Sequence, residues 1–301
     1  MTGVPVAAAL LLAVWAGAAC RPARDEAAGQ ESLALTARAS RLEQALARPD
    51  SGDKRGDAIA RWVLPETLRE ISGLALTADG RLLTVGDERG KVFEVDYRRG
   101  VMIKEFTLGH PALHEDFESI TVAGDKVFLL ASNGVLYEVP EGADGATVAY
   151  TRHDAGLARQ CEFEGVAFDP AIHSLLLACK TVHDKALRDS LVIYRWTLPP
   201  GSNPTLSHLA VSLKRVIGSN GWDGLHPSDL TIDPFNGNYV LVAAREQALI
   251  EITPAGDVVF ARPLPGVHDQ GEGVAITKDS ILIISDERVT GPAVITLYRW
   301  P

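Results

Sequence analysis

The chain has 301 residues, of which 46% are hydrophobic and 23% are charged. This composition is typical of a folded globular protein and excludes a disordered one. The 39 acidic residues outnumber the 29 basic ones and give a net charge of −10. A nucleic-acid-binding protein needs a basic face to neutralise phosphates, so we expect no nucleic-acid partner.

The first twenty residues have the features of an export signal. Residues 4–19 form an almost wholly apolar run, shorter than the ~20 residues of a transmembrane helix. The run ends in Gly17-Ala18-Ala19-Cys20, which resembles a bacterial lipobox, where the cysteine receives a lipid. We therefore expect a signal peptide over residues 1–20 and a lipid on Cys20. That lipid would anchor the protein to a membrane of the cell envelope, facing the periplasm or the exterior. An ordinary cleaved signal peptide and an uncleaved anchor are the alternatives.

Residues 21–57 have the composition of a tether. Within them, residues 31–47 are predicted to form a helix, with Leu35, Leu42 and Leu46 on one narrow stripe. Such a helix either stays solvated or docks through that stripe. The Pro-Asp-Ser-Gly-Asp segment at 49–53 ends the helical pattern.

From residue 59 onward, short β-branched and aliphatic runs alternate with Gly, Asp, Asn and Pro turns, which indicates an all-β domain over residues 58–301. A motif of one short strand, a turn and a second strand occurs five times. The equivalent residues at the start of the five motifs are Ser72, Glu118, Glu164, Ser228 and Glu272. Their spacings are 46, 46, 64 and 44 residues, and three of these fit the ~40–50 residues of a four-stranded propeller blade. The spacing predicts a five-bladed β-propeller, with a six-bladed ring or a β-sandwich as alternatives.

The strand count predicts how the ring closes. The first four motifs each continue into a third and a fourth strand, and the fourth strand of the second motif is expected over residues 147–151. The fifth motif has only three strands before Pro301, whereas residues 58–64 form a spare strand at the front. The spare strand is expected to complete the last blade, which would leave no exposed sheet edge.

Several sequence blocks occur in a fixed order along residues 58–301. They are Ile71-Ser72-Gly73-Leu74-Ala75, Asp116-Phe117-Glu118-Ser119-Ile120, Cys161-Glu162-Phe163-Glu164-Gly165, Leu176-Leu177-Ala178-Cys179-Lys180, His226-Pro227-Ser228-Asp229-Leu230 and Gln270-Gly271-Glu272-Gly273-Val274-Ala275. In these blocks the chain resembles the SdiA-regulated family of bacterial envelope propellers. The resemblance implies a β-propeller and an envelope location, but no known reaction. More distantly, the chain is similar to esterase-like phytase and gluconolactonase-type propellers, in which a central metal carries the chemistry.

The inner strands of a propeller line a central channel, so Glu118, Glu164 and Glu272 are expected to meet at one mouth, with Ser72 and Ser228 completing the ring. Three unpaired carboxylates in a narrow channel would raise one another's pKa values. A divalent cation such as Ca²⁺, held by the three glutamates, would offset this repulsion. The other solution is an internal charge network in which Lys180 and Arg245 pair with the glutamates.

Two further groups of residues have a predicted role. His226 precedes an inner strand, as do His110, His114 and His268, and a His beside a Glu at the mouth would suit ligand binding or general-base catalysis. Cys161 and Cys179 lie at adjoining ends of two antiparallel strands. They are expected either to form a disulfide, which would persist outside the cytoplasm, or to remain buried thiols.

Two classes of function follow from these expectations. The first is a binding module of the cell envelope, which recognises a small molecule or an envelope protein on one face of the ring, with a divalent cation at the channel mouth as a candidate cofactor. The second is a metal-dependent hydrolase that acts on a phosphate ester or a lactone. The ring glutamates are structural or ligand-binding residues in the first class and metal ligands in the second.

Overall fold

The computed structural model describes residues 23–48, 56–200 and 205–301. The predicted signal peptide and Cys20 lie outside these residues. Within the described part of the chain, no helix is both long enough and apolar enough to cross a membrane.

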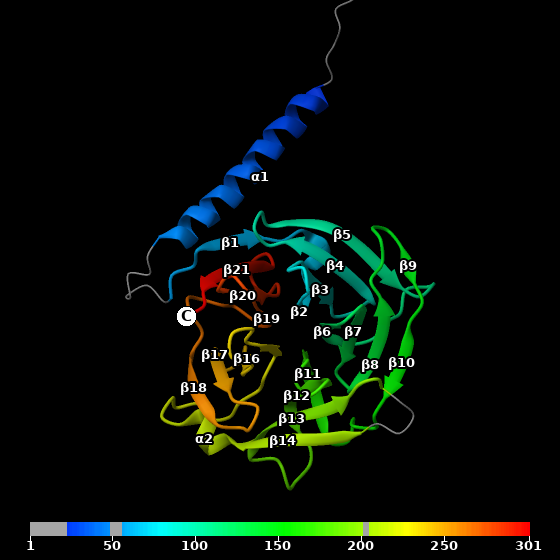
Figure 1. Cartoon of the computed structure of the whole chain (residues 1–301), viewed down its shortest axis with the longest axis vertical. Helices are drawn as coiled ribbons and strands as arrows, with labels where there is room; N and C mark the ends of the chain where they lie inside the picture. The colour runs from blue at the N-terminus through cyan, green and yellow to red at the C-terminus, as the bar shows by residue number, and fades with distance from the viewer. Residues whose placement is uncertain (1–22, 49–55, 201–204) are drawn as a thin grey trace, which may run out of the picture.

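The described residues form a ring of five antiparallel sheets (Figure 1), so the prediction of a five-bladed β-propeller is confirmed and the six-bladed and sandwich alternatives are wrong. Blade 1 consists of β2 (Ile71–Leu76), β3 (Leu82–Gly86), β4 (Lys91–Asp96), β5 (Val101–Leu108) and the short β9 (Thr147–Val148). Blade 2 consists of β6 (Phe117–Ala123), β7 (Lys126–Ala131), β8 (Val135–Pro140) and β10 (Thr151–Asp154). Blade 3 consists of β11 (Cys161–Asp169), β12 (Ser174–Val182), β13 (Ser190–Thr197) and β14 (Leu206–Ser212).

Blade 4 consists of β15 (Asp229–Ile232), β16 (Tyr239–Ala243), β17 (Ala248–Ile252) and β18 (Val258–Pro263). Blade 5 consists of β19 (Gly271–Ile276), β20 (Ile281–Asp286), β21 (Val294–Arg299) and β1 (Ala60–Val63). In blade 5, β1 pairs antiparallel with β21, and Trp62 lies opposite Ile295. Strands from the two ends of the propeller sequence therefore share one sheet.

One strand differs from the sequence-based assignment. Residues 147–151 were expected to be the fourth strand of blade 2, but β9 pairs in parallel with β5 of blade 1, and β10 is the fourth strand of blade 2. The cause is local: the amide of Thr107 donates to the carbonyl of Ala146, and the amide of Glu105 donates to the Asp144 carboxylate. These bonds hold the segment before β10 against blade 1.

The core lies between the blades. Five clusters of buried hydrophobic side chains fill the five spaces between neighbouring sheets, because alternate residues along each strand point to opposite sheet faces. In β3, for example, Leu82 packs toward blade 5, whereas Leu83 and Val85 pack toward blade 2. Both faces of the inner part of each sheet are buried in this way, which explains why the second and third strands of most blades are hydrophobic along most of their length, whereas the outermost strands are more polar.

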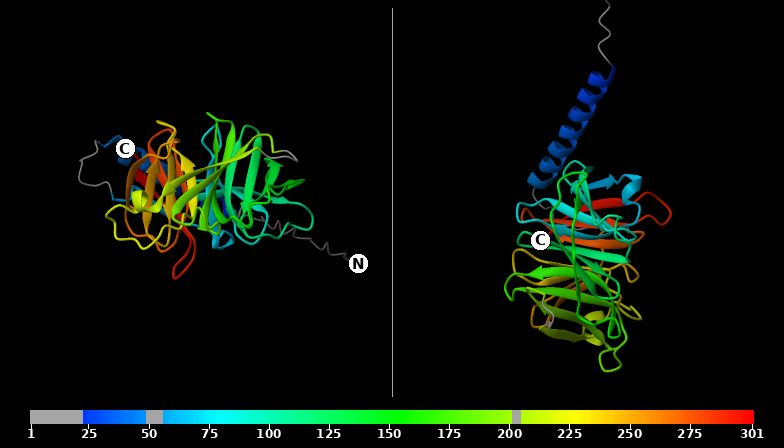
Figure 2. Two further views of the ribbon diagram at one scale, coloured as in Figure 1. Left: turned by 90° about the horizontal axis from the view of Figure 1, so that it is seen from below. Right: turned by 90° about the vertical axis from the view of Figure 1, so that its right-hand side faces the viewer.

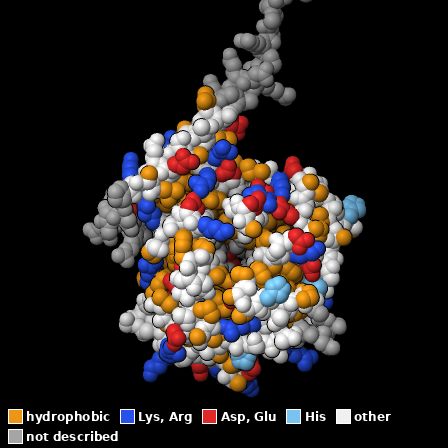
Figure 3. Space-filling model, in the orientation of Figure 1, with side chains coloured by type: hydrophobic (Ala, Val, Ile, Leu, Met, Phe, Trp, Pro, Cys, Tyr) orange, Lys and Arg blue, Asp and Glu red, His pale blue; other side chains and the backbone are white. Residues whose placement is uncertain are grey.

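The ring has two faces. We call the face on which the inner strands β2, β6, β11, β15 and β19 begin the upper face, and the opposite face, on which they end, the lower face. Figure 2 shows the ring from its sides, with the C-terminus at the lower face, and Figure 3 shows the lower face itself. All candidate residues from the repeat motif lie at the starts of the inner strands and therefore on the upper face.

The helix α1 (Ala23–Ala47) begins before the predicted residue 31 and lies against the outside of blades 1 and 5 (Figure 1). Leu42 is only 1% exposed and belongs to the core cluster between those blades, and Leu46 packs against the same cluster. The guanidinium of Arg299 donates to the carbonyl of Leu46 at 3.0 Å and to that of Arg48 at 2.7 Å. The end of the helix is thus docked rather than solvated.

Candidate functional site at the upper mouth of the channel

The ring glutamates share one backbone feature. Glu118, Glu164 and Glu272 are each the extra residue of a β-bulge, because the ladder between the first two strands of the blade skips a register position there. The same irregularity covers Ser72 in blade 1. A bulge changes the direction of the side chain of its extra residue, which no longer follows the alternation of side chains between the two faces of the sheet. The repeat motif therefore presents this residue at the channel mouth in four of the five blades.

The environment of the three glutamates favours their neutral form. Burial, together with the charge of Glu164, raises the pKa of Glu118 to about 9. Burial also raises the pKa of Glu164 to about 8, although Lys180 opposes the shift. The pKa of Glu272 is raised by burial as well. Burial therefore opposes the ionisation of all three groups, and only at Glu164 does a neighbouring ammonium, that of Lys180, form an ion pair that counters this effect.

A pocket of about 540 Å³ opens between blades 3, 4 and 5 at this mouth, and we call it the upper pocket. Its walls include six of the eight predicted site residues: Glu164, Lys180, His226, Ser228, Arg245 and Glu272. Ser72 and Glu118 do not line it. Its remaining walls come from Thr181, Ala244, Asp269 and Gln270.

The two basic residues of the upper pocket behave differently. The Lys180 ammonium forms an ion pair with the Glu164 carboxylate. Arg245, by contrast, pairs with none of the ring glutamates: its nearest carboxylate in the described chain is that of Glu246, 3.9 Å from Nε, and its side chain is 74% exposed. The predicted network therefore forms at Lys180 but not at Arg245, whose guanidinium faces the solvent at the pocket entrance.

His226 is held by a carboxylate that the sequence did not single out. Its Nδ1 lies 2.8 Å from Oε1 of Glu246, and its backbone amide donates to Oε2 of the same residue at 3.0 Å. The Glu246 side chain is only 7% exposed. His268 is buried instead, with Nδ1 2.7 Å from Asp286 Oδ2, and does not line the pocket.

Below the pocket, one carboxylate connects all five blades. Asp229 of blade 4 accepts hydrogen bonds from the Ser119 hydroxyl of blade 2 (2.7 Å), the Leu74 amide of blade 1 (3.2 Å) and the Val274 amide of blade 5 (2.9 Å). The Ser119 hydroxyl oxygen in turn accepts the Val166 amide of blade 3 at 3.1 Å. Asp229 has no exposed surface, and burial raises its pKa to about 8 against the opposing effect of these hydrogen bonds.

Small residues make room for this carboxylate. The positions equivalent to Asp229 are Gly73, Ser119, Gly165 and Gly273 in the other blades. A methyl group on Gly73 would lie 2.5 Å from the Ser119 hydroxyl, and one on Gly165 would lie 2.9 Å from the Leu230 amide nitrogen. The axis thus has space for only one larger side chain. The sequence analysis did not single out Asp229, but the pattern of glycine, serine, glycine, aspartate and glycine is visible in the aligned motifs and is a signal that could have found it.

The described residues do not contain a preformed metal centre. In the described parts of the chain, no three His, Cys, Asp or Glu side chains are grouped so that they could hold a metal ion. Instead, Glu164 is engaged by Lys180, and the Gln270 amide donates to the Glu272 carboxylate at 2.7 Å.

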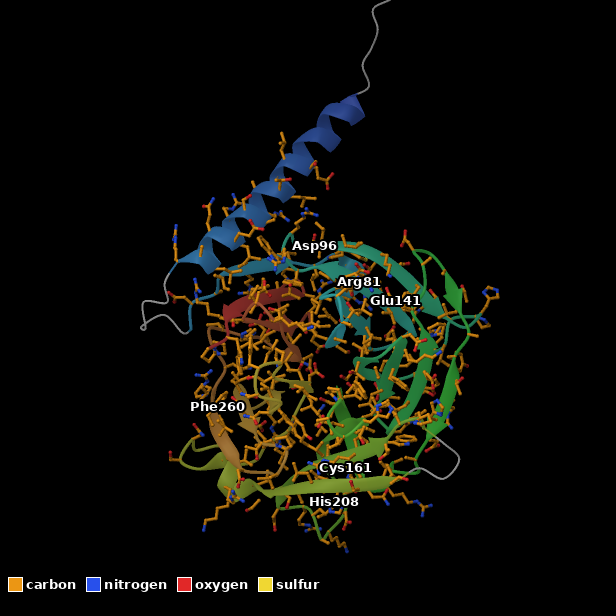
Figure 4. The ribbon with its side chains drawn as sticks, viewed as in Figure 1. Arg81, Asp96, Glu141, Cys161, His208 and Phe260 are labelled. Carbon is orange, nitrogen blue, oxygen red and sulfur yellow. A yellow bond between two sulfur atoms is a disulfide. The ribbon has the colours of Figure 1, made fainter. Side chains whose placement is uncertain are left out.

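Cys161 and Cys179 form a disulfide between β11 and β12, with their Cα atoms 5.5 Å apart. Figure 4 labels Cys161 at the start of β11. The bond lies beside the bulge at Glu164 and directly before Lys180. It therefore fixes the two strands that carry this ion pair.

Comparisons with known proteins agree with the fold. The SdiA-regulated family model matches residues 209–298, which confirms the resemblance to that family over this segment. No match to a curated protein was found. Among solved structures, a glutaminyl cyclase from Myxococcus xanthus is 13% identical with a TM-score of 0.54, and the match covers 80% of this chain and 94% of that one. A PQQ-bound aldose sugar dehydrogenase from Streptomyces coelicolor is 14% identical with a TM-score of 0.49, and the match covers 79% and 98% of the two chains. At such low identities the structural likeness concerns the fold alone.

Proposed function

We propose that this protein is a β-propeller of the cell envelope that binds a small molecule with a positively charged group in the upper pocket. The observation that carries the proposal is that two buried carboxyl groups with raised pKa values, Glu164 beside Lys180 and Glu272 beside Gln270, line one pocket of about 540 Å³. Ligand sites typically have volumes of ~300–1,000 Å³ and a few convergent polar groups.

The charges explain why a cation suits the pocket. Ionisation of Glu164 and Glu272 is unfavourable because both groups are buried and because the charge of Glu272 raises the pKa of Glu164. A positive charge placed between them would offset both effects. Binding should therefore release protons, and the affinity should rise as the pH is raised from acidic to mildly alkaline values.

Isothermal titration with putrescine as the probe tests this proposal. We expect saturable binding whose heat changes with the ionisation enthalpy of the buffer, and a loss of about tenfold in affinity for Glu272→Gln, since one carboxylate is worth roughly one pKa unit of interaction. The matched control is Glu31→Gln, because Glu31 is exposed on α1, far from the channel. Binding that is absent, or equally strong in Glu272→Gln, would contradict the proposal.

A divalent cation is the second source of positive charge that we propose to test at this mouth. Ca²⁺ takes oxygen ligands from carboxylates, hydroxyls and water, and Glu164, Ser228 and Glu272 all line the pocket. Titration with CaCl₂ under the same conditions distinguishes the two sources. Heat from Ca²⁺ that disappears in Glu272→Gln would assign the site to the metal, and heat from putrescine alone would assign it to an organic cation.

Attachment to the membrane is a separate part of the proposal. The sequence Gly17-Ala18-Ala19-Cys20 supports a lipid on Cys20 that holds the ring at a membrane surface. Fractionation of cells that express Cys20→Ser tests it: the parent protein should stay with carbonate-washed membranes and the variant should not. Retention of Cys20→Ser in the washed membranes would contradict the lipid anchor.

The pair His226–Glu246 favours a second candidate, a hydrolase. A histidine oriented by a buried carboxylate in a ligand-sized pocket is an arrangement that serves a general base, which would activate water against an ester, a lactone or a phosphate ester. A substrate panel of these three classes, with and without added metal, tests this candidate. Turnover that falls at least a hundredfold in His226→Ala would support it, since general-base catalysis contributes ~10²–10⁴-fold.

A further inference from the structure

We propose that the lower face holds a second binding site, which takes an amphipathic molecule with a straight apolar chain and an anionic head group. A pocket of about 700 Å³ opens at the centre of this face, and we call it the lower pocket. Figure 3 shows hydrophobic side chains gathered around the hollow at the centre of the lower face. The proposal does not depend on the upper pocket, with which the lower pocket shares no lining residue.

The wall of the lower pocket is a ring of five apolar side chains, one from each blade, at the same position of each inner strand. They are Leu76, Val122, Phe168, Ile232 and Ile276. All but Ile276 are only partly buried. A continuous apolar ring in a concave site, left open to water, is typical of a site that binds an apolar group.

Some threonine hydroxyls in the wall of the lower pocket already take part in hydrogen bonds within the protein. The Thr121 hydroxyl oxygen accepts the Phe168 amide at 3.1 Å, and that of Thr77 accepts the Arg81 amide at 2.9 Å. The apolar ring side chains provide the larger share of the surface inside the pocket. An apolar chain would bury there without leaving polar groups unpaired.

The charged side chains at the rim of the lower pocket indicate which head group a ligand there would carry. Asp79 forms an ion pair with Arg81, which also binds Glu141 where blades 1 and 2 meet (Figure 4). Asp279 pairs with Arg98 in the same way. Lys278 lines the pocket, is exposed and has no ion pair in the part of the chain that the structure describes. The unpaired charge at the rim is therefore positive, which favours an anionic head over a neutral or cationic one.

The volume of the lower pocket, about 700 Å³, is sufficient for a medium-length chain, and buried residues form its inner end. Its deepest residues include Leu74, Val166 and Leu230, which are at most 3% exposed and lie next to the buried carboxyl of Asp229. A chain that enters from the lower face meets this floor and cannot pass further. A carboxylate with a chain of about ten carbons fits a site of this class.

Equilibrium dialysis with radiolabelled decanoate, below the concentration at which it forms micelles, tests the proposal on the full-length protein. We expect one saturable site. Ile232→Gln, which places an amide in the apolar ring, should weaken binding about tenfold or more, because an unpaired amide is costly in an apolar site. Ile103→Gln is the matched control: Ile103 is 51% exposed on the outer part of blade 1 and does not line the pocket, so this variant should bind like the parent.

The head group and the location are tested separately. 1-Decanol, which keeps the chain and lacks the charge, should bind more weakly than decanoate, and Lys278→Ala should reduce the difference in affinity between these two probes. Glu272→Gln, in the upper pocket, should leave decanoate binding unchanged, which separates this proposal from that of the cationic ligand.

Absence of saturable decanoate binding, or an equal loss in Ile232→Gln and Ile103→Gln, would overturn the proposal. A concentration-dependent dimer in light scattering that Ile232→Gln abolishes would also overturn it, since a second copy of the chain would then cover the apolar ring.

Discussion

At the scale of single residues, the side chain of Asp229 in blade 4 is hydrogen-bonded directly to three other blades. Its carboxylate accepts three hydrogen bonds from three other blades and has no contact with water. Buried donors that lose their acceptor each cost about 1–3 kcal/mol. The side chain therefore acts as a common acceptor that sets the distance between the inner strands.

We expect Asp229→Ala to lower the free energy of unfolding by about 3–6 kcal/mol, because it leaves the Ser119 hydroxyl and two backbone amides without an acceptor. Asp229→Asn should cost much less, since its carbonyl can still accept both amides. Urea unfolding measures both variants, with the exposed hairpin residue in Asp125→Ala as the control. A loss below about 1 kcal/mol in Asp229→Ala would show that water or a rearranged strand replaces the acceptor.

Glu118 gives a prediction about pH. Its pKa is raised to about 9 in the folded protein, whereas an unfolded glutamate titrates near 4.3. Between these values the folded state holds a proton that the unfolded state has released, so stability should fall as the pH rises from about 4 to 9. The melting temperature should therefore decrease from about pH 5 to about pH 9, and the decrease should be smaller in Glu118→Gln, which cannot ionise. Identical pH profiles for the two proteins would contradict this prediction.

At the scale of elements, α1 shows how a few contacts dock a helix. They lie in its C-terminal half, where Leu42 enters the cluster between blades 1 and 5 and the Arg38 guanidinium lies 5.4 Å from the centre of the Trp62 ring. One side of the helix therefore contacts the propeller, and its other side is exposed to solvent.

Leu42→Ala should destabilise the protein by about 2–4 kcal/mol, since a cavity would replace a buried leucine. Leu33→Ala on the same helix should change stability by less than about 0.5 kcal/mol, because Leu33 is 72% exposed. Thermal unfolding of the two variants makes the comparison. If both lose equally little, the helix is not docked in solution.

The repeat motif in the sequence was sufficient to predict the inner strands and the bulge residues, because each motif places a polar residue before a hydrophobic strand. It could not predict that Ser72 and Glu118 lie outside the upper pocket, since this depends on how the blades are inclined around the axis. The pairing of β9 with β5 rests on two residues, too few for a strand pattern. The contact between His226 and Glu246 depends on loop conformation, which hydrophobic patterning does not encode.

At the scale of the whole molecule, β1 converts an open series of blades into a closed ring. Its pairing with β21 covers an edge that would otherwise present unpaired amides and carbonyls to other molecules. Residues 58–301 should therefore remain monomeric, whereas residues 65–301, which lack β1, should aggregate. Light scattering of the two truncated proteins at equal concentration tests this expectation, and equal monodispersity of both would contradict it.

The burial of Asp229 has one further consequence. Its carboxyl group has no exposed surface, and the glycines and the serine at equivalent positions of the other blades pack closely around the axis, so among the described residues the ring is closed at this level. A solute released on the side of the ring glutamates cannot diffuse through the molecule to the side of the apolar ring. The two faces of the propeller are therefore chemically different. Binding on one face can affect binding on the other only through the inner strands that contribute residues to both pockets, and not through a pore.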